Sequence, residues 1–421
     1  MARPLPQPAR IYQVGGVVRD ELLGRPNADR DFVVVGVTPE TMLASGFRPV
    51  GRDFPVFLHP DTNEEYALAR TERKHGRGYR GFEFFASPDV TLEEDLSRRD
   101  LTINAMARSV DGRLIDPHGG QADLAAGILR HVSPAFVEDP LRVLRVARFA
   151  ARLGFVVAPE TEALMRAIVA SGELATLAPE RIWQELAKGL MEARPSRMFA
   201  VLRECGALVQ LLPEVDGLFG VPASPPLPGA IDSGVHVAMA LDWSADHGGT
   251  LPARYAILTH DLWPAAVSRD AWPAQPANTR QSERIGQRVS DRLKVPLDSR
   301  DAARLASRWL RTVHRAAELR PANLLDLLHA TDALRRPARL EALLQVGAAD
   351  ACSQPGAAQD YPPVNVLRGA LGAVKAVDAG AIARAAASSK GEQNDEVIPK
   401  AVRAARLKAL RAWHRALLPR P

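Results

Sequence analysis

The chain has 421 residues, of which 46% are hydrophobic and 24% are charged, and its formal net charge is +5. These values are those of an ordinary globular protein. The length exceeds one hydrophobic core and predicts two to four domains. No apolar run approaches the roughly 18 residues of a membrane span, so we expect no membrane association.

Two features of the sequence predict a cytoplasmic protein. Residues 1–6 contain no apolar signal-peptide core. Cys205 and Cys352 lie far apart without metal-binding spacing, which favours a reducing compartment. The basic balance favours a polyanionic partner, although charge alone is equally compatible with a solvated basic surface.

Short strands and helices alternate over residues 10–135. Thr38 is a suitable N-cap for a helix whose first residue is Pro39. Charges and glycines dominate residues 72–88, which predicts a mobile loop. The other elements that we expect in this part are strands at 11–14, 31–35 and 65–69 and a short helix at 17–23.

The remainder of the chain is predicted to be helical. Gly154 is a plausible C-cap for the first of these helices. Proline-rich or irregular breaks fall at residues 221–228 and 352–363. The expected helical segments are 140–153, 159–170, 179–191, 230–345 and 399–418, the last of them basic and amphipathic.

The most informative motif is a glycine pair, Gly15 and Gly16, followed by the alternating acids Asp29 and Asp31. Side chains two apart on a strand share a face, so both carboxylates can point to one place. Two hard oxygen ligands suit Mg²⁺, with phosphates completing its shell. The glycines let backbone N–H groups approach a triphosphate at a helix N-terminus. The motif predicts a nucleotidyl-transfer site.

A two-metal site of this kind needs a third carboxylate. Glu65 follows on the next predicted strand and is our candidate, with Glu64 as the alternative. An edge-strand charge without function would explain Glu65 equally well.

The run from Arg98 to Met106 places polar groups beside an apolar core pattern. The guanidinium fork of Arg99 matches phosphate oxygens. Asp100 and Asn104 are four residues apart, so they are expected to face sugar hydroxyls or to hold the loop. A solvated helix face is the alternative interpretation.

Asp139, Arg142, Arg145 and Arg148 are spaced by three and predict a slowly drifting stripe on one helix. Cytosine and adenine both present an amino donor beside a ring-nitrogen acceptor. The carboxylate of Asp139 can accept from the amino group while Arg142 donates to the ring nitrogen. Guanine and uracil present the opposite pattern, so this pair would accept C and A only. A solvent-facing ion pair is the alternative, and it would contribute little.

These three motifs together resemble the bacterial class II CCA-adding enzymes, which are tRNA nucleotidyltransferases. The resemblance is dense over residues 10–220 and weaker beyond. It implies an α+β fold, with a small polymerase-beta-like nucleotidyltransferase head followed by an all-α neck, body and tail. It implies Mg²⁺-dependent addition of C, C and A to tRNA 3′ ends from CTP and ATP, without a nucleic-acid template. A monomer or a homodimer is expected.

The resemblance also assigns residues and boundaries. The positions that match its metal ligands are Asp29 and Asp31, and those that match its nucleotide contacts are Gly16, Arg19, Arg99, Asp139, Arg142, Arg145 and Arg148. We expect a head over residues 1–137, a neck over 138–220, an HD-like helical domain over 221–350 and a tail over 351–421. The tRNA is expected along neck, body and tail, with the basic helix from Lys400 to Arg411 as one candidate contact.

Long members of the family carry an HD phosphohydrolase domain with a divalent-metal site. His236 and the pair His260-Asp261 are present here, but Trp263 and Pro264 stand where the family has Gly-Lys. The downstream histidines are replaced by residues 275–278, and His314 is far along the sequence without an adjacent acid. The resemblance therefore predicts that the HD fold persists while its hydrolase activity is lost or severely weakened.

Three other functions share parts of this pattern. A poly(A) polymerase of the same superfamily has the head motifs, but the intact Asp139 and Arg142 favour CCA addition. A CC-only enzyme has an altered loop after the third acidic strand, whereas residues 73–81 are present here. A non-catalytic RNA-binding module is disfavoured by the intact Asp29 and Asp31.

Overall fold

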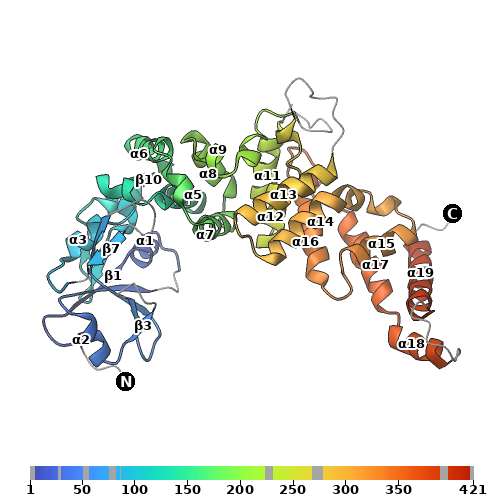
Figure 1. The fold of residues 1–421 in the computed structure, drawn as a ribbon, viewed down its shortest axis with the longest axis horizontal. Coiled ribbons are helices and arrows are strands. Elements are labelled where there is room, and N and C mark those ends of the chain that lie inside the picture. The colour runs from blue at the N-terminus through green and yellow to red at the C-terminus, as the bar shows by residue number, and fades with distance from the viewer. Residues whose placement is uncertain are drawn as a thin grey trace. The chain divides into compact units, whose positions relative to one another are not determined.

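The computed structural model describes residues 5–26, 30–50, 56–74, 82–85, 87–222, 231–267, 278–388 and 397–417 (Figure 1). The chain forms two compact units, Met1–Leu211 and Leu212–Pro421. The first combines a mixed sheet with helices, and the second is helical. The predicted α+β class is confirmed, while the finer division into four parts stays a prediction.

A seven-stranded sheet is the framework of the first unit, with strand order β3-β4-β5-β2-β1-β8-β9. All neighbouring strands are antiparallel except β2 and β5, which run parallel. Its strands are β1 (Arg10–Val14), β2 (Asp31–Val35), β3 (Arg48–Val50), β4 (Val56–Leu58), β5 (Glu65–Leu68), β8 (Ala107–Ser109) and β9 (Leu114–Ile115).

Strand β2 is buried on both faces of the sheet. Val33 and Val35 belong to one hydrophobic cluster and Val34 to another, as the two-residue period of a strand requires. Helix α3 (Leu92–Ser97) packs Leu96 into the first cluster, and α2 (Pro39–Ala44) packs Met42 into the second. The apolar run that predicted this strand therefore reflects a position in the middle of the sheet.

Local predictions are confirmed where short-range chemistry decides them. Thr38 accepts the backbone N–H of Thr41 and caps α2, with Pro39 at its first position. Helix α1 (Gly16–Leu22) and β5 lie within a residue of the expected bounds.

The loop expected over residues 72–88 is wrong in part. Strand β6 (Thr71–Lys74) pairs antiparallel with β7 (Phe82–Phe85). Three phenylalanines in β7 have high strand propensity, which the neighbouring charges and glycines obscured. Residues 75–81, which include most of the loop expected to favour A addition, lie outside the described residues.

Helices complete the first unit. Helix α5 packs against α7 and α8, and Gly154 ends α5 in the left-handed conformation, as expected. The remaining elements are α4 (Gly120–Ala126), β10 (Ile128–Leu129), α5 (Leu141–Leu153), β11 (Val156–Val157), α6 (Pro159–Ala170), α7 (Pro179–Leu190), α8 (Pro195–Glu204) and α9 (Ala207–Leu211), with 3-10 helices at Thr102–Asn104, Pro134–Glu138 and Glu173–Thr176.

The second unit is built from packed helices. Helix α14 contacts α12, α13 and α16, and α19 contacts α15, α17 and α18. Its elements are α10 (Pro213–Asp216), α11 (Ser233–Asp246), α12 (Leu251–Thr259), α13 (Thr279–Arg292), α14 (Leu297–His314), α15 (Pro321–Ala330), α16 (Pro337–Cys352), α17 (Pro363–Lys375), α18 (Ala379–Ser388) and α19 (Val397–Leu417), with 3-10 helices at Pro264–Ala266 and Ala316–Glu318.

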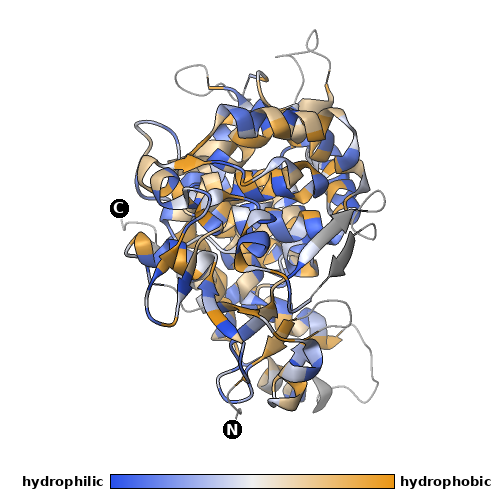
Figure 2. Ribbon diagram, turned by 90° about the vertical axis from the view of Figure 1, so that its left-hand side faces the viewer, coloured by the Kyte–Doolittle hydropathy of each residue, from blue (hydrophilic) through white to orange (hydrophobic). Residues whose placement is uncertain are grey.

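Hydrophilic and hydrophobic residues are interleaved along the helices (Figure 2). None of the described helices combines the length and the apolar character needed to cross a membrane. The apolar side chains instead fill the interior of each unit, where many leucines and alanines are fully buried.

Candidate active site

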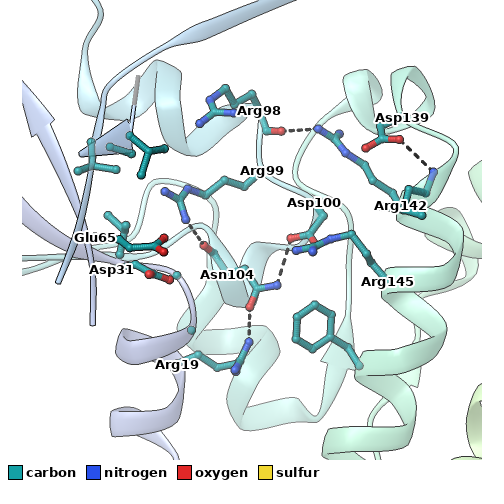
Figure 3. Close-up of a pocket in the computed structure, with 18 of the residues that line it drawn as sticks. Arg19, Asp31, Glu65, Arg98, Arg99, Asp100, Asn104, Asp139, Arg142 and Arg145 are labelled. Atoms are coloured by element: carbon teal, nitrogen blue, oxygen red, sulfur yellow. Dashed lines mark hydrogen bonds and ion pairs between the residues drawn. The ribbon is translucent and has the colours of Figure 1, made fainter. Parts of the chain in front are cut away.

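A cavity of about 530 Å³ opens in the first unit between the sheet, the loop after α3 and helices α5 and α7 (Figure 3). Its lining is rich in arginine and carboxylate groups. The polar residues that line it are Arg19, Asp31, Glu65, Arg70, Arg98, Arg99, Asp100, Asn104, Asp139, Arg142, Arg145, Arg148, Arg152 and Arg181. Except for Asp29, every residue predicted for the site lies in this lining.

Two acids form one edge of the cavity. The parallel pairing of β2 with β5 sets Asp31 directly opposite Glu65, and both side chains are exposed. Adjacent strands lie about 4.8 Å apart, so the two carboxylates are near neighbours, as Figure 3 shows. Glu64 faces elsewhere: it accepts from the Thr62 hydroxyl at 2.8 Å and does not line the cavity. The register thus places Glu65, rather than Glu64, beside Asp31.

Asp29 lies outside the described residues. Among the residues that the structure describes, no group of three or more His, Cys, Asp and Glu side chains is arranged to hold a metal ion. Asp31 and Glu65 nevertheless supply two adjacent hard oxygen donors, which is the donor chemistry that Mg²⁺ requires.

Gly15 and Gly16 form the turn into α1 at the floor of the cavity. Gly15 has φ +70°, which other residues rarely adopt, and a Cβ there would lie 2.9 Å from Nη1 of Arg99. The glycine therefore allows the Arg99 guanidinium to approach the backbone at this turn.

Arg19 is nearly inaccessible, with 2% of its surface exposed. Its guanidinium donates to Asn104 Oδ1 at 2.5 Å and to Asp20 Oδ1 at 2.8 Å. Burial lowers the pKa of Arg19 from its ordinary value, and Asp20 opposes that effect. Asp20 also accepts from Arg152 of α5 at 2.8 Å. Arg19, expected as a nucleotide contact, is thus a lining residue already held by the protein.

Asp95 lies beneath the next two arginines with none of its surface exposed. It accepts from Arg98 at 2.9 Å and from Arg99 at 3.1 Å. Burial alone would raise the pKa of this carboxyl, but the two guanidinium groups hold it below its usual range.

Asp100 is buried and binds three groups. Its Oδ1 accepts from the Leu101 N–H at 2.8 Å and from Asn104 Nδ2 at 3.1 Å, and its Oδ2 accepts from Arg145 at 2.7 Å. Burial raises the pKa of Asp100, but Arg145 and Asn104 outweigh it and hold that pKa far below its usual range. The four-residue spacing of Asp100 and Asn104 thus serves a loop contact and not a helix face.

Glu185 of α7 fixes the two outer arginines of the predicted stripe. It accepts from Arg148 at 2.6 Å and lies 3.8 Å from Arg145. Arg148 is 7% exposed, and its guanidinium lies 4.5 Å from the centre of the Phe149 ring. Arg145 and Arg148, expected as nucleotide contacts, therefore line the cavity while engaged by carboxylates.

Asp139 and Arg142, the predicted base-reading pair, both line the cavity but contact different partners. Arg142 donates to the backbone oxygen of Arg98 at 2.6 Å (Figure 3) and to that of Ala135 at 3.1 Å. Asp139 accepts from Arg181 at 3.0 Å and from the Leu141 N–H at 3.1 Å. The solvent-facing ion pair between Asp139 and Arg142 is therefore not formed.

The sequence reasoning missed residues that hold the site together. Most of their contacts join segments far apart in the chain, whereas Asp95 binds arginines three and four residues away. The missed residues are Asp20, Asp95, Arg98, Arg152, Arg181 and Glu185. For Arg181 and Glu185 the sequence did offer a signal, the amphipathic pattern of helix α7, in which both residues lie beside the apolar face.

A second polar cluster lies in the second unit. Asp350 of α16 accepts from His236 at 2.9 Å, and its other oxygen is 3.0 Å from His314 Nε2. His260 is 4.0 Å away, and the Tyr361 hydroxyl bonds the second nitrogen of His314 at 2.8 Å. His314 has no acid next to it in the sequence, but the packing of α14 against α16 brings Asp350, 36 positions further along the chain, into contact with it.

The aspartate of the His-Asp pair has a different partner. Asp261 accepts from the Ser282 hydroxyl of α13 at 2.9 Å. Ser282 also accepts the Trp263 N–H at 3.1 Å. Residues 275–277, expected to replace the family's histidines, lie outside the described residues.

Two segments match described families. Residues 11–130 match the "Poly A polymerase head domain", and residues 154–218 match the "Probable RNA and SrmB- binding site of polymerase A". Together with the mixed sheet and its arginine-lined cavity, these matches define a nucleotidyltransferase of the polymerase-head class.

Relatives extend over nearly the whole chain. The "Multifunctional CCA protein" of Nitrosomonas europaea is 58% identical and covers 89% of this chain and 91% of its own length. That of Dechloromonas aromatica is 56% identical and covers 96% and 97%. The Bacillus stearothermophilus CCA-adding enzyme solved in complex with CTP superposes with a TM-score of 0.64 at 25% identity, covering 97% of this chain and 94% of that one. The chain belongs to the multifunctional CCA protein family.

The buried carboxyl of Asp100 makes the stability of the first unit depend on pH. Its folded-state pKa lies below the unfolded value of about 3.9, so its contribution is complete above that pH and is lost as pH falls. We expect Asp100→Asn to lower the free energy of unfolding by about 3 kcal/mol at pH 7, because it uncouples Arg145. Urea unfolding at pH 7 and pH 3 tests this. The variant and the unchanged protein should differ less in free energy of unfolding at pH 3 than at pH 7. An equal difference at both pH values would contradict the prediction.

Proposed function

We propose that this protein adds C, C and A to tRNA 3′ ends during maturation and repair, using CTP and ATP, with Mg²⁺ and without a nucleic-acid template. The observation that carries the proposal is one cavity that joins the acids Asp31 and Glu65 to the candidate base readers Asp139 and Arg142. Family membership supports the same reaction, because the relatives are named multifunctional CCA proteins.

The acid edge is proposed as the metal-binding part. Asp29, Asp31 and Glu65 would hold Mg²⁺, which supplies positive charge at the reacting phosphates. The 3′-hydroxyl of tRNA attacks the α-phosphate of the nucleotide, the bond to the β-phosphate breaks, and pyrophosphate leaves. The chain contributes position and charge.

The arginines are proposed to orient the triphosphate. Arg99 is only partly buried, and Gly15 lets it reach the turn at the start of α1, where the first N–H groups of the helix have no partner within the helix. Asp95 fixes the Arg99 side chain through a hydrogen bond. The remaining N–H groups of Arg99 can therefore bind the triphosphate without a large further loss of side-chain entropy.

Base selection is proposed to depend on Asp139 and Arg142. A guanidinium has five N–H donors, and the two backbone contacts of Arg142 leave others for a ring nitrogen. A carboxylate has about four acceptor sites, so Asp139 keeps capacity for an amino hydrogen beside its contacts with Arg181 and Leu141. Arg181 orients the carboxylate before a nucleotide arrives.

We also propose that the HD-like domain has lost its phosphohydrolase activity. Trp263 and Pro264 replace the glycine and lysine expected after the His-Asp pair. Asp261 is hydrogen-bonded to Ser282, and the carboxylate of Asp350 is engaged by His236 and His314. These contacts support a structural role for the cluster.

The acid edge gives the first test. Asp29→Asn, Asp31→Asn and Glu65→Gln should each lower the incorporation of labelled CTP and ATP into a tRNA transcript lacking CCA by ~10²-fold or more. Binding of the tRNA should be nearly unchanged. Glu64→Gln is the matched control and should retain activity, since Glu64 faces away from the cavity.

Equal losses for Glu64→Gln and Glu65→Gln would reject the assignment of the third carboxylate. Sequencing the products also separates the alternatives. Addition of CCA supports the proposed reaction, while A tails alone indicate a poly(A) polymerase, CC alone a CC-only enzyme, and no product a non-catalytic module.

Arg142→Ala should blur the selection of C and A against U and G. Loss of one charge-assisted hydrogen bond is worth about 1.5–3 kcal/mol, or roughly 10- to 100-fold in discrimination. Competition between the four nucleotides measures the effect. Arg166→Ala, an exposed change on α6 that breaks only a pair with Glu162, should leave selection intact. Unchanged selection by Arg142→Ala would argue against base reading there.

The hydrolase proposal has its own assay. Purified protein supplied with Mg²⁺, Ni²⁺ or Co²⁺ should show no metal-stimulated hydrolysis of a phosphomonoester or of 2′,3′-cyclic AMP. His260→Ala serves as the background control. Metal-stimulated turnover that His260→Ala abolishes would refute the loss of activity.

A further inference from the structure

Helix α13 of the second unit, labelled in Figure 1, carries a regular series of cations in its sequence. Arg280, Arg284 and Arg288 are spaced by four residues, and all three side chains are exposed. Residues four apart lie on one face of a helix, about 6 Å apart along its axis. The opposite face buries Ile285 and Val289 in the unit, so the three guanidinium groups point to solvent as one ladder.

No carboxylate among the described residues forms an ion pair with these three arginines. The next arginine in the series, Arg292, binds Glu214 through two contacts of 2.7 and 2.8 Å. Glu214 acts on Arg288 only through longer-range electrostatics. Asp291 accepts a hydrogen bond from Gln287 at 3.1 Å and forms an ion pair with Arg300. Like charges at this spacing destabilise a helix by some tenths of a kcal/mol per pair, so the ladder works against the stability of α13.

The basic helix α19, expected from the sequence to contact tRNA, differs from α13. Arg403 binds Asp326 of α15 at 2.8 Å, and Arg406 lies 3.4 Å from His329 Nε2. Leu410 is fully buried. Part of the charge of α19 therefore serves to dock it on α15, whereas the charge of the α13 ladder has no such role within the described residues.

We propose that the α13 ladder binds the phosphate backbone of the tRNA substrate. The inference rests on the proposed function for the identity of the RNA. Guanidinium groups pair with phosphate oxygens in a fork geometry. The ladder contains no aromatic side chain for stacking on bases, which fits backbone contact without sequence reading. Its face carries no large apolar side chain either, so insertion into a membrane surface is not favoured.

The test is tRNA binding by the full-length protein at several salt concentrations. Arg280→Gln, Arg284→Gln and Arg288→Gln combined should weaken binding of a tRNA transcript lacking CCA by ~10-fold or more. The slope of log Kd against log salt should fall by about 2–3, since each phosphate contact contributes about 0.7–0.9. Glutamine preserves helix propensity, so the melting temperature should stay equal or rise.

The matched control removes the same charge elsewhere in the unit. Arg315, Arg335 and Arg368 are exposed, but each is paired with an acid, and their triple change to glutamine should leave binding nearly unchanged. In the ladder variant, kcat at saturating tRNA and the KM for CTP should be those of the unchanged protein, with only the KM for tRNA raised. These kinetic constants distinguish the two proposals. If the proposed reaction is wrong, CCA addition is absent from the unchanged protein as well as from the ladder variant.

Three outcomes would overturn the proposal. The ladder variant could retain the original Kd and salt slope, or the control variant could lose as much affinity as the ladder variant. The third is a ladder variant that binds tRNA normally but loses attachment to anionic phospholipid vesicles, which would indicate a membrane contact.

Discussion

Buried carboxylates hold the arginine side chains of the cavity in place, and the site depends on this pairing. Asp95 binds Arg98 and Arg99, Asp100 binds Arg145, and Glu185 binds Arg148. So many guanidinium groups around one space would repel each other without these partners. Because the carboxylates are buried and fixed, the positive charge is already oriented for the triphosphate that we propose binds here, and little reorganisation remains.

The same pairs connect the head to the helix that follows it. Asp100 lies in the loop after α3 and Arg145 on α5. Asp20 of α1 binds Arg152 of α5 in the same way. The acids on the sheet and the candidate base readers therefore belong to one body. The distance between them is set by ion pairs whose carboxylates are buried, which weakens screening by salt.

Sequence reasoning recovered what local patterns encode. The apolar run that predicted β2, the Thr38 cap and the Gly154 C-cap are decided by neighbouring residues. It also named Asp31, Asp139 and Arg142, which all line the cavity, because their motifs are short and chemically specific. The choice between Glu64 and Glu65 stayed open because it depends on the register between two strands more than thirty residues apart.

The functional contacts that sequence reasoning missed also depend on residues far apart in the chain. Arg181 reaches Asp139 across 42 residues, and His314 meets Asp350 through the packing of two helices. Nothing in the immediate sequence of either residue reports such a partner. The β6–β7 hairpin was missed for another reason, since charge and glycine content outweighed the strand propensity of its phenylalanines.

The two acceptors of the Arg142 guanidinium have an evolutionary consequence. Both are main-chain oxygens, of Arg98 and Ala135. Any residue at those two positions supplies the same oxygen, so side chains there can drift among relatives without moving the arginine, provided that the backbone keeps its path. The position of the Arg142 guanidinium is in this sense inherited through the course of the polypeptide, and a search for covarying side chains would not find its anchor.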